Sequence, residues 1–301
     1  MGDLASRLDE TVSRLRGWGI RVIDASRLTK SVSQLRTVAD VGSFPTSDSD
    51  LVRVAHAVRD AQEFFEIADV LPESALKPLA VDLQQAVGGT LGVGGNAAAQ
   101  FQSQLWVGAM LVWAGARTAM LLNAEGKRPD FVVENGVSLY PVEVKPPSGK
   151  INAPHLVSEA TRQIAAVKRG HGGAIIVDLT DCMPGHLSVE FGHGPRGDGA
   201  DKRVIQKPAR PIHNEIFDTA LGQIKPNRRM VFVLLTFARY AYWNRDDLTR
   251  PYVGKYVASV VYWRHHPNTL AAHRARWLAG LIDKGIRAAG HGASELEQLD
   301  L

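Results

Sequence analysis

The stretch that decides the fold lies in the middle of the chain, at residues 128–147, and reads RPDFVVENGVSLYPVEVKPP. Asn135-Gly136 favours a two-residue type I′ turn, because both central positions of that turn need a positive φ. Strand-like runs flank this dipeptide at residues 130–134 and 137–145. We therefore expect a β-hairpin.

The expected hairpin brings charged side chains together near its open end. With the turn at Asn135-Gly136, Asp130 lies opposite Pro141, and the period-two alternation of a strand places Glu143 and Lys145 on the same face. Asp130 and Glu143 are then diagonal neighbours, roughly 7–8 Å apart at their backbones and within reach of one small ion. Two carboxylates and an ammonium group suit a hard cation such as Mg²⁺, with the lysine holding or deprotonating a water. Pro141 leaves a second arrangement open, because a proline inside a strand implies an edge or a bulge.

The pattern Pro129-Asp130 followed by Glu143-Val144-Lys145 resembles the PD-(D/E)XK nuclease superfamily, which includes many restriction endonucleases and DNA-repair nucleases. The resemblance implies that Asp130 and Glu143 bind Mg²⁺, for which Mn²⁺ can substitute. It also implies that Val144 lends a backbone carbonyl to the metal and that Lys145 positions the attacking water. The expected activity is hydrolysis of phosphodiester bonds, in DNA first of all. The alternative is an exposed hairpin with ordinary surface charges, because Glu-x-Lys is common in strands.

The segments around the hairpin follow the order that this superfamily shares. We expect a buried helix at residues 97–116 that leads into a strand at 118–122. After the hairpin come a helix at 155–169 and an apolar strand at 173–179. The expected fold class is therefore α/β, with a restriction-endonuclease-like mixed sheet flanked by helices and preceded by an all-helical N-terminal domain.

Glutamines flank the expected site on both neighbouring helices. Relatives frequently place a glutamine or a basic residue on the helix after the Glu-x-Lys strand. Gln163 is the matching position, and the resemblance adds it to the expected catalytic residues. The tyrosine that some relatives carry four residues later is Val167 here. Superfamily members often carry a further metal-binding glutamate on the preceding helix, where this chain offers Gln100, Gln102 and Gln104. We therefore expect one metal ion, with Gln104 either orienting a water or satisfied as a core amide.

Composition and charge narrow the class of partner. The chain has 301 residues, a single cysteine and a start too charged for a secretory signal peptide, so we expect a cytoplasmic protein without an internal disulfide. Its apolar run at residues 105–116 is too short to cross a bilayer, and no membrane partner is expected. Residues 1–95 carry 10 Lys and Arg against 13 Asp and Glu, whereas residues 96–301 carry 25 against 18. The net charges of −3 and +7 favour a polyanionic partner for the second part.

Three segments define the expected domain organisation. Residues 1–87 show apolar positions at helical spacing and predict an accessory helical domain, for target recognition, for homodimerisation or another protein partner, or for structure alone. The glycine-rich residues 88–95 predict a flexible linker, because they lack the Lys-Ser/Thr of a phosphate-binding P-loop. Residues 96–301 form the expected nuclease-like domain.

The C-terminal part of this domain is expected to carry an irregular, basic inserted loop at about 181–229 that contacts nucleic acid. Two strands at 230–238 and 257–263 and a closing helix at 269–288 follow. Aromatic and basic residues alternate between 239 and 264, which suits base stacking with phosphate contact and equally suits the edge of a core. The rivals to an enzyme are a catalytically silent nucleic-acid-binding module and a protein-interaction module.

Overall fold

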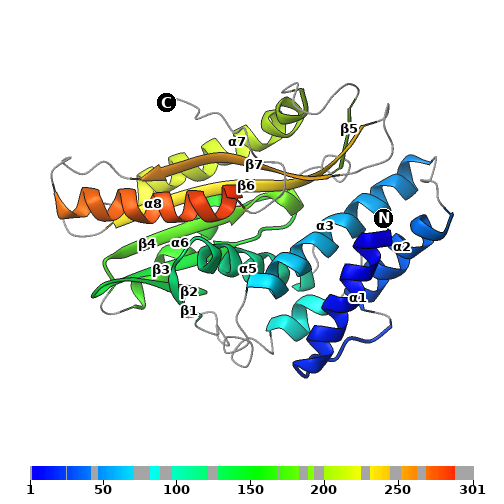
Figure 1. The fold of residues 1–301 in the computed structure, drawn as a ribbon. Helices are drawn as coiled ribbons and strands as arrows, with labels where there is room; N and C mark the ends of the chain where they lie inside the picture. The colour runs from blue at the N-terminus through cyan, green and yellow to red at the C-terminus, as the bar shows by residue number, and fades with distance from the viewer. Residues whose placement is uncertain are drawn as a thin grey trace.

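The structure is a computed structural model that describes residues 2–24, 26–41, 47–70, 82–88, 97–120, 128–167, 170–182, 189–192, 200–224, 231–244, 252–262 and 269–288. Helices cover a mixed β-sheet, and the N-terminal helices pack at one end of it (Figure 1). The expected glycine-rich linker lies, apart from Gly88, outside the described residues. The mixed α/β class predicted from the sequence is confirmed.

The N-terminal part is helical, as its apolar spacing predicted. Its helices are α1 (Gly2–Gly17), α2 (Arg27–Val41) and α3 (Asp48–Val70), and residues 82–87 are helical as well. Apolar residues that recur every three or four positions are buried along each helix, because that spacing puts them on one face. None of the helices in the described part of the chain is long and apolar enough to span a membrane.

Seven strands form the sheet within the residues that the structure describes. They are β1 (Arg117–Met120), β2 (Phe131–Asn135), β3 (Ser138–Lys145), β4 (Gly172–Asp178), β5 (Val189–Gly192), β6 (Val231–Asn244) and β7 (Tyr252–Tyr262). Strands β1, β2 and β3 form an antiparallel meander, and β3, β4 and β6 are parallel. Strand β7 pairs antiparallel with β6, while β4 and β5 pair with successive parts of β6. Because a strand has two edges, β4 and β5 share one edge of β6 and β7 takes the other.

Helices cover both faces of this sheet. One hydrophobic cluster joins α5 (Ala97–Trp113) and α8 (Leu270–Ala288) to residues of β2, β3, β4 and β6, and the same cluster continues into α1, α2 and α3. A second cluster joins α6 (Ala153–Ala165) and α7 (Ala200–Gln223) to alternate residues of β4 and β6. The N-terminal helices therefore share a core with the sheet; their assignment as a separate domain stays a prediction.

The hairpin turn lies one residue later than predicted. Asn135 pairs with Ser138, so the two turn residues are Gly136 and Val137. Gly136 has a φ of +59° and Val137 does not have a positive φ, which is the pattern of a type II′ turn, in which glycine takes the first central position. Each residue of β2 therefore pairs with a residue of β3 two positions later than predicted. Because this shift is even, every side chain stays on its predicted face of the sheet.

Pro141 does not introduce a bulge between β2 and β3. The register is continuous from Phe131 opposite Val142 to Asn135 opposite Ser138, with Pro141 opposite Val132. Continuing that register places Asp130, the residue before β2, directly opposite Glu143. The predicted diagonal relation of these carboxylates is therefore wrong, and the two are closer neighbours than expected.

The prediction of an irregular loop at about 181–229 is also wrong for the residues that the structure describes there. Strand β5 and the 24-residue helix α7 occupy most of it. Pro208 and Pro211 lie inside α7, and proline interrupts the hydrogen bonds of a helix interior. Burial of Ala209, Ile216 and Ala220 against α6 and the sheet stabilises the helix despite those prolines.

Candidate functional site

The predicted acidic residues meet at the open end of the hairpin. The Asp130 backbone N–H donates to Glu143 Oε2 at 3.3 Å, and the Val144 N–H donates to Asp130 Oδ2 at 2.8 Å. Asp130 is partly buried, and only 1% of the surface of Glu143 is exposed. From α5, Gln104 Nε2 donates to Asp130 Oδ1 at 3.2 Å. The two carboxylates predicted from the sequence pattern thus lie next to each other, and Gln104 contacts one of them.

Lys145 lies beside these carboxylates and is held by three acceptors. Its Nζ atom lies 2.8 Å from Glu143 Oε1, 2.8 Å from Gln163 Oε1 and 3.2 Å from Glu159 Oε1. A lysine ammonium has three N–H donors, so this arrangement uses all of them. Gln163 also donates to the Arg128 carbonyl oxygen at 3.4 Å, which ties α6 to the start of the hairpin.

Burial and charge set the protonation behaviour of the site. Burial and the neighbouring Glu143 carboxylate raise the pKa of Asp130 well above its ordinary value. Burial also raises the pKa of Glu143, against the opposing charge of Lys145. Burial lowers the pKa of Lys145, but Glu143 and Glu159 raise it more, so the net shift is upward. Two carboxylates that ionise reluctantly beside a protonated lysine favour the arrival of further positive charge.

A pocket of about 430 Å³ opens beside this cluster. Asp130, Val144 and Lys145 form part of its wall, with further walls from α5 and from the loop and first turns of α6. Asn152 caps that helix by accepting from the His155 N–H at 3.1 Å. Asp130 and Lys145 are therefore reachable from a concavity, which is the usual setting of a small-molecule or active site.

Two acidic residues of the site were missed by the sequence reasoning. Glu159 lies four residues before Gln163 on α6, so helical spacing puts both on one face, and this signal could have identified it. Asp82 lines the pocket, and its charge contributes to the raised pKa of Asp130. No local pattern marks Asp82, because its position depends on packing between distant parts of the chain.

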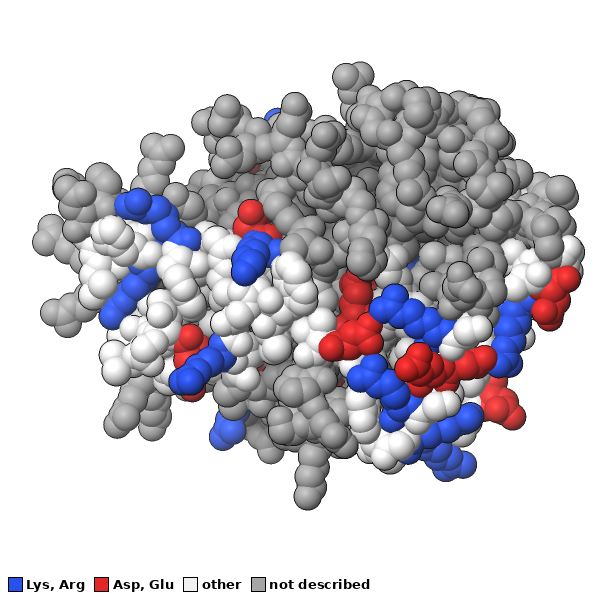
Figure 2. All heavy atoms as spheres, in the orientation of Figure 1, with Lys and Arg blue, Asp and Glu red and all other residues white. Residues whose placement is uncertain are grey.

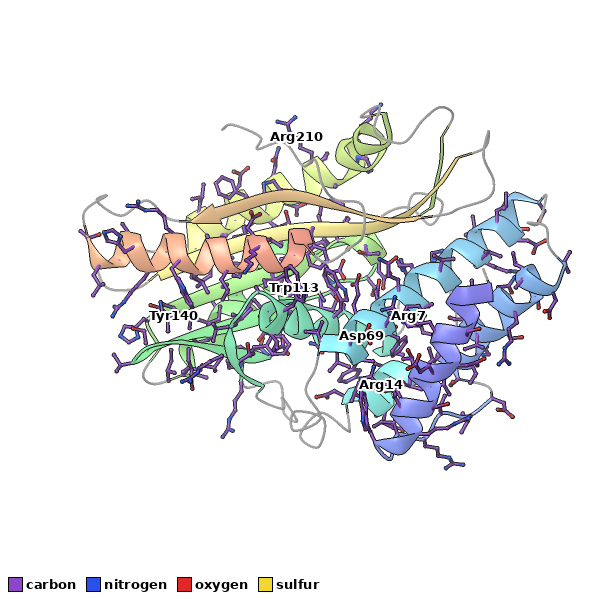
Figure 3. All side chains as sticks on the ribbon, viewed as in Figure 1. Arg7, Arg14, Asp69, Trp113, Tyr140 and Arg210 are labelled. Atoms are coloured by element: carbon purple, nitrogen blue, oxygen red, sulfur yellow. The ribbon has the colours of Figure 1, made fainter. Side chains whose placement is uncertain are left out.

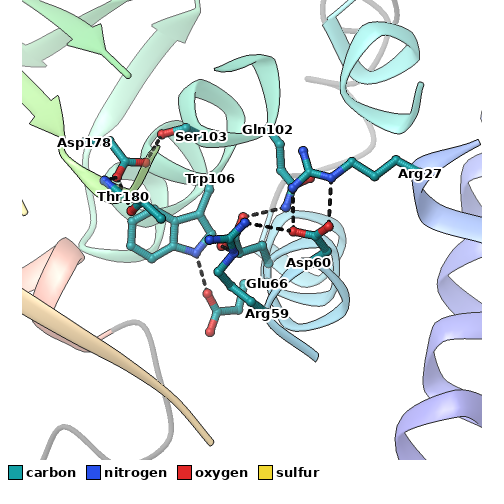
Figure 4. A network of polar contacts seen from close by, with 10 residues as sticks. Arg27, Arg59, Asp60, Glu66, Gln102, Ser103, Trp106, Asp178 and Thr180 are labelled. Carbon is teal, nitrogen blue, oxygen red and sulfur yellow. Dashed lines mark hydrogen bonds and ion pairs between the residues drawn. The ribbon is translucent and has the colours of Figure 1, made fainter. Parts of the chain in front are cut away.

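A second polar cluster lies buried between the N-terminal helices and α5 (Figure 4). Arg27 forms a two-bond ion pair with Asp60, through Nε at 2.8 Å and Nη2 at 2.5 Å. Arg59 lies 3.6 Å from Asp60 and 3.8 Å from Glu63, and Gln102 donates to Glu63. On the other side of the network, Ser103 of α5 donates to Asp178 at the end of β4 (Figure 4).

The described surface shows mixed charge over the N-terminal helices. Acidic and basic side chains are interspersed there (Figure 2), and Arg7 and Arg14 both bind Asp69 (Figure 3). Of the basic residues expected to contact nucleic acid, Lys207 and Arg210 are exposed on α7. The aromatic and basic side chains at 239–264 lie outside what the structure describes.

The predicted catalytic set of Asp130, Glu143, Lys145 and Gln163 is therefore contiguous in space, and the roles of these residues stay predictions. Comparisons of this chain with protein-family models, with curated proteins and with solved structures found no match.

Proposed function

We propose that the protein is a metal-dependent nuclease that hydrolyses phosphodiester bonds, those of DNA first of all. The observation that carries this proposal is the cluster at the open end of the hairpin. Asp130 and Glu143 lie side by side, and Lys145 is fixed next to them at the wall of a pocket. Paired carboxylates with an adjacent ammonium group suit metal-assisted attack of water on a phosphate.

The order of the surrounding elements supports a restriction-endonuclease-like fold. Helix α5, the meander β1–β2–β3, helix α6 and the parallel strand β4 follow one another in the order expected from the sequence. The meander delivers Asp130 and Glu143 to one place, and α6 supplies Gln163 from the adjoining crossover. We propose this fold for residues 97–178.

The donor atoms of the cluster fit Mg²⁺ or Mn²⁺. Each carboxylate oxygen of Asp130 and Glu143 accepts one contact, from Gln104, Val144, Asp130 or Lys145, and has lone pairs for a second. No group of three or more His, Cys, Asp and Glu side chains arranged to hold a metal occurs within the described ranges. Mg²⁺ commonly binds through one or two carboxylates and retains waters, so Asp130, Glu143 and the Val144 carbonyl would hold it. When bound, the cation lowers the pKa of a water and stabilises charge on the phosphate.

Lys145 orients the attacking water in this proposal. Its raised pKa keeps it protonated at neutral pH, so it acts as a hydrogen-bond donor rather than as a base. Gln163 and Glu159 fix the ammonium group from α6, while Glu143 takes the third donor. One of these donors must leave its acceptor before Lys145 can hold a water in line with the scissile bond.

Cleavage assays test the proposal directly. The purified protein is incubated with plasmid, linear duplex and single-stranded DNA and with RNA, in Mg²⁺ or in EDTA. We expect the wild type to cleave in Mg²⁺ and not in EDTA. The variants Asp130→Asn and Lys145→Met are expected to lose this cleavage. Glu134→Gln is the matched control, because Glu134 is exposed near the far end of β2 on the same face. Equal inactivity of the wild type and these variants on every substrate would count against a nuclease, and salt-sensitive binding without cleavage would indicate a silent binding module.

Asp130→Asn also has a stability readout. Because the fold raises the pKa of Asp130, the ionised carboxylate is less favourable in the folded chain than in the unfolded chain. At neutral pH the asparagine variant is therefore expected to melt at or above the wild-type temperature, and Mg²⁺ is expected to raise the melting temperature of the wild type alone. A variant that loses cleavage because it unfolds would instead melt lower.

A further inference from the structure

The pocket beside Asp130 and Lys145 is wider than a water or a cation needs. Its volume of about 430 Å³ falls within the range of about 300–1,000 Å³ typical of pockets that enclose an organic ligand. We propose that this pocket receives one unpaired nucleotide, so that the substrate is a single strand, or a duplex with an unpaired end, rather than continuous duplex. The position of the phosphate in this inference rests on the proposed nuclease function.

The apolar part of the wall suits the face of a base. Phe101 and Leu105 of α5 lie on one side, and Ile151 and Leu156, before and within α6, also contribute to the lining. Phe101 is partly buried against the core, so one part of its ring is packed and another part can be reached from the pocket. Bases stack on aromatic side chains with little dependence on sequence, because every base has a π-face.

The polar part of the wall suits the edge of a base. Gln100 and Gln104 lie four residues apart on α5 and therefore on one face of the helix, and both line the pocket. Gln104 uses its amide nitrogen on Asp130 and retains a carbonyl oxygen as an acceptor. Gln100 is partly exposed, and its amide supplies both donors and an acceptor. Such groups recognise neutral nucleobases, which carry donors and acceptors together.

The distribution of charge around the pocket indicates how the nucleotide is oriented in it. Asp82 and Asp130 make the wall near α5 acidic, which disfavours a phosphate there without a cation. Lys145, at the end of β3, is paired with Glu143 and with Glu159, which also lines the pocket, whereas Lys150 is exposed on the loop before α6. The phosphate therefore lies beside Lys150 and the neutral base points towards α5.

A base within a duplex cannot make these contacts. Its faces are covered by its neighbours and its edge is paired, so enzymes that enclose a base act on single strands or extrude the base first. Asp130, one of the two proposed metal-binding carboxylates, lines the pocket, so the scissile phosphate and the enclosed base belong to adjoining positions of one strand.

Binding measurements test this inference separately from cleavage. The probe is a fluorescently labelled oligodeoxythymidylate roughly twelve nucleotides long, alone or annealed to its complement, followed by anisotropy with Ca²⁺ in place of Mg²⁺. We expect the single strand to bind at least about tenfold more tightly than the duplex. Phe101→Ala is expected to weaken single-strand binding roughly 5- to 150-fold, the loss that follows from removing one stacking partner.

Matched variants separate stacking from misfolding. Phe101→Trp keeps an aromatic face and should retain binding, whereas Trp113→Ala removes an exposed aromatic at the other end of α5 and should leave binding unchanged. If Phe101→Ala does not melt cooperatively, Gln100→Ala takes its place, with an expected loss of about 2- to 10-fold. Duplex binding as tight as single-strand binding, or unchanged single-strand affinity in folded Phe101→Ala or, in its place, Gln100→Ala, would overturn the inference.

The outcomes also separate this inference from the proposed function. Binding of single strands that depends on Phe101, with no Mg²⁺-dependent cleavage, would support the nucleotide pocket and contradict the nuclease. Cleavage of continuous duplex that is insensitive to Phe101→Ala would support the nuclease and contradict the pocket.

Discussion

His56 is expected to make the stability of the fold depend on pH. It lies on α3 beside the buried ion pair, and only 4% of its surface is exposed. Burial, with a further contribution from the Arg59 charge, lowers the pKa of His56 to about 3 from an ordinary value of 6.5. The imidazole is therefore neutral in the folded chain over the range in which it becomes charged in the unfolded chain.

The sign and size of the effect follow from this difference in pKa. Below 6.5 the unfolded chain binds a proton at His56 that the folded chain does not, so acid favours unfolding. With pKa values of 6.5 unfolded and about 3 folded, a change from about pH 7.5 to about pH 5 removes about 2 kcal/mol of unfolding free energy. The loss begins as the pH falls through 6.5 and grows until it approaches 3.

Urea unfolding, followed by circular dichroism at several pH values, measures this loss. The variant His56→Gln lacks the titrating group and should lose about 2 kcal/mol less than the wild type over that range, whatever its stability at neutral pH. His273→Gln, at an exposed position on α8, is the control and should follow the wild type. Equal losses in the wild type and in His56→Gln would refute the assignment of a low pKa to this histidine.

The remaining predictions concern packing. Arg27→Met should cost about 3 kcal/mol in urea unfolding, because the buried Asp60 loses both bonds to Arg27 and keeps only the more distant Arg59, and a second change of Asp60 to leucine should recover part of that loss. Gly173→Ala should lower the yield and melting temperature of folded protein sharply, because its Cβ would lie 2.3 Å from the Pro141 carbonyl oxygen. Gly222→Ala, in open space on α7, should change the stability by no more than about 1 kcal/mol and in the stabilising direction; the opposite order of the two alanine variants would contradict the described packing.

The hairpin and its charged face could be predicted because their signals are local. Alternation along β3 places Glu143 and Lys145 on one face in either register, so an error of one residue in the turn did not move the site. The position of the turn could not be predicted, because Gly136 can occupy either central position of a two-residue turn. In the observed turn only the first central position has a positive φ, and Gly136 occupies it.

The features that were predicted wrongly or missed depend on contacts between residues that are distant in the sequence. Pro208 and Pro211 argue locally against a helix, and α7 exists because its apolar residues reach a face of the sheet that no local pattern shows. Asp82 reaches the pocket through packing of the segment that precedes α5. Glu159 could have been predicted from its spacing to Gln163. Surface glutamates are common on helices, however, and the spacing identifies this one as part of the site because Lys145 lies between the two side chains.

Helix α5 connects the N-terminal helices to the candidate site. Gln102 and Trp106 are four residues apart and donate to Glu63 and Glu66 of α3, whereas Gln104, on the opposite face, donates to Asp130. Apolar packing alone is not directional, but hydrogen bonds at both faces fix the rotation of α5 about its axis. Since α5 also forms one wall of the pocket, we infer that the N-terminal helices help to set the shape of the site itself.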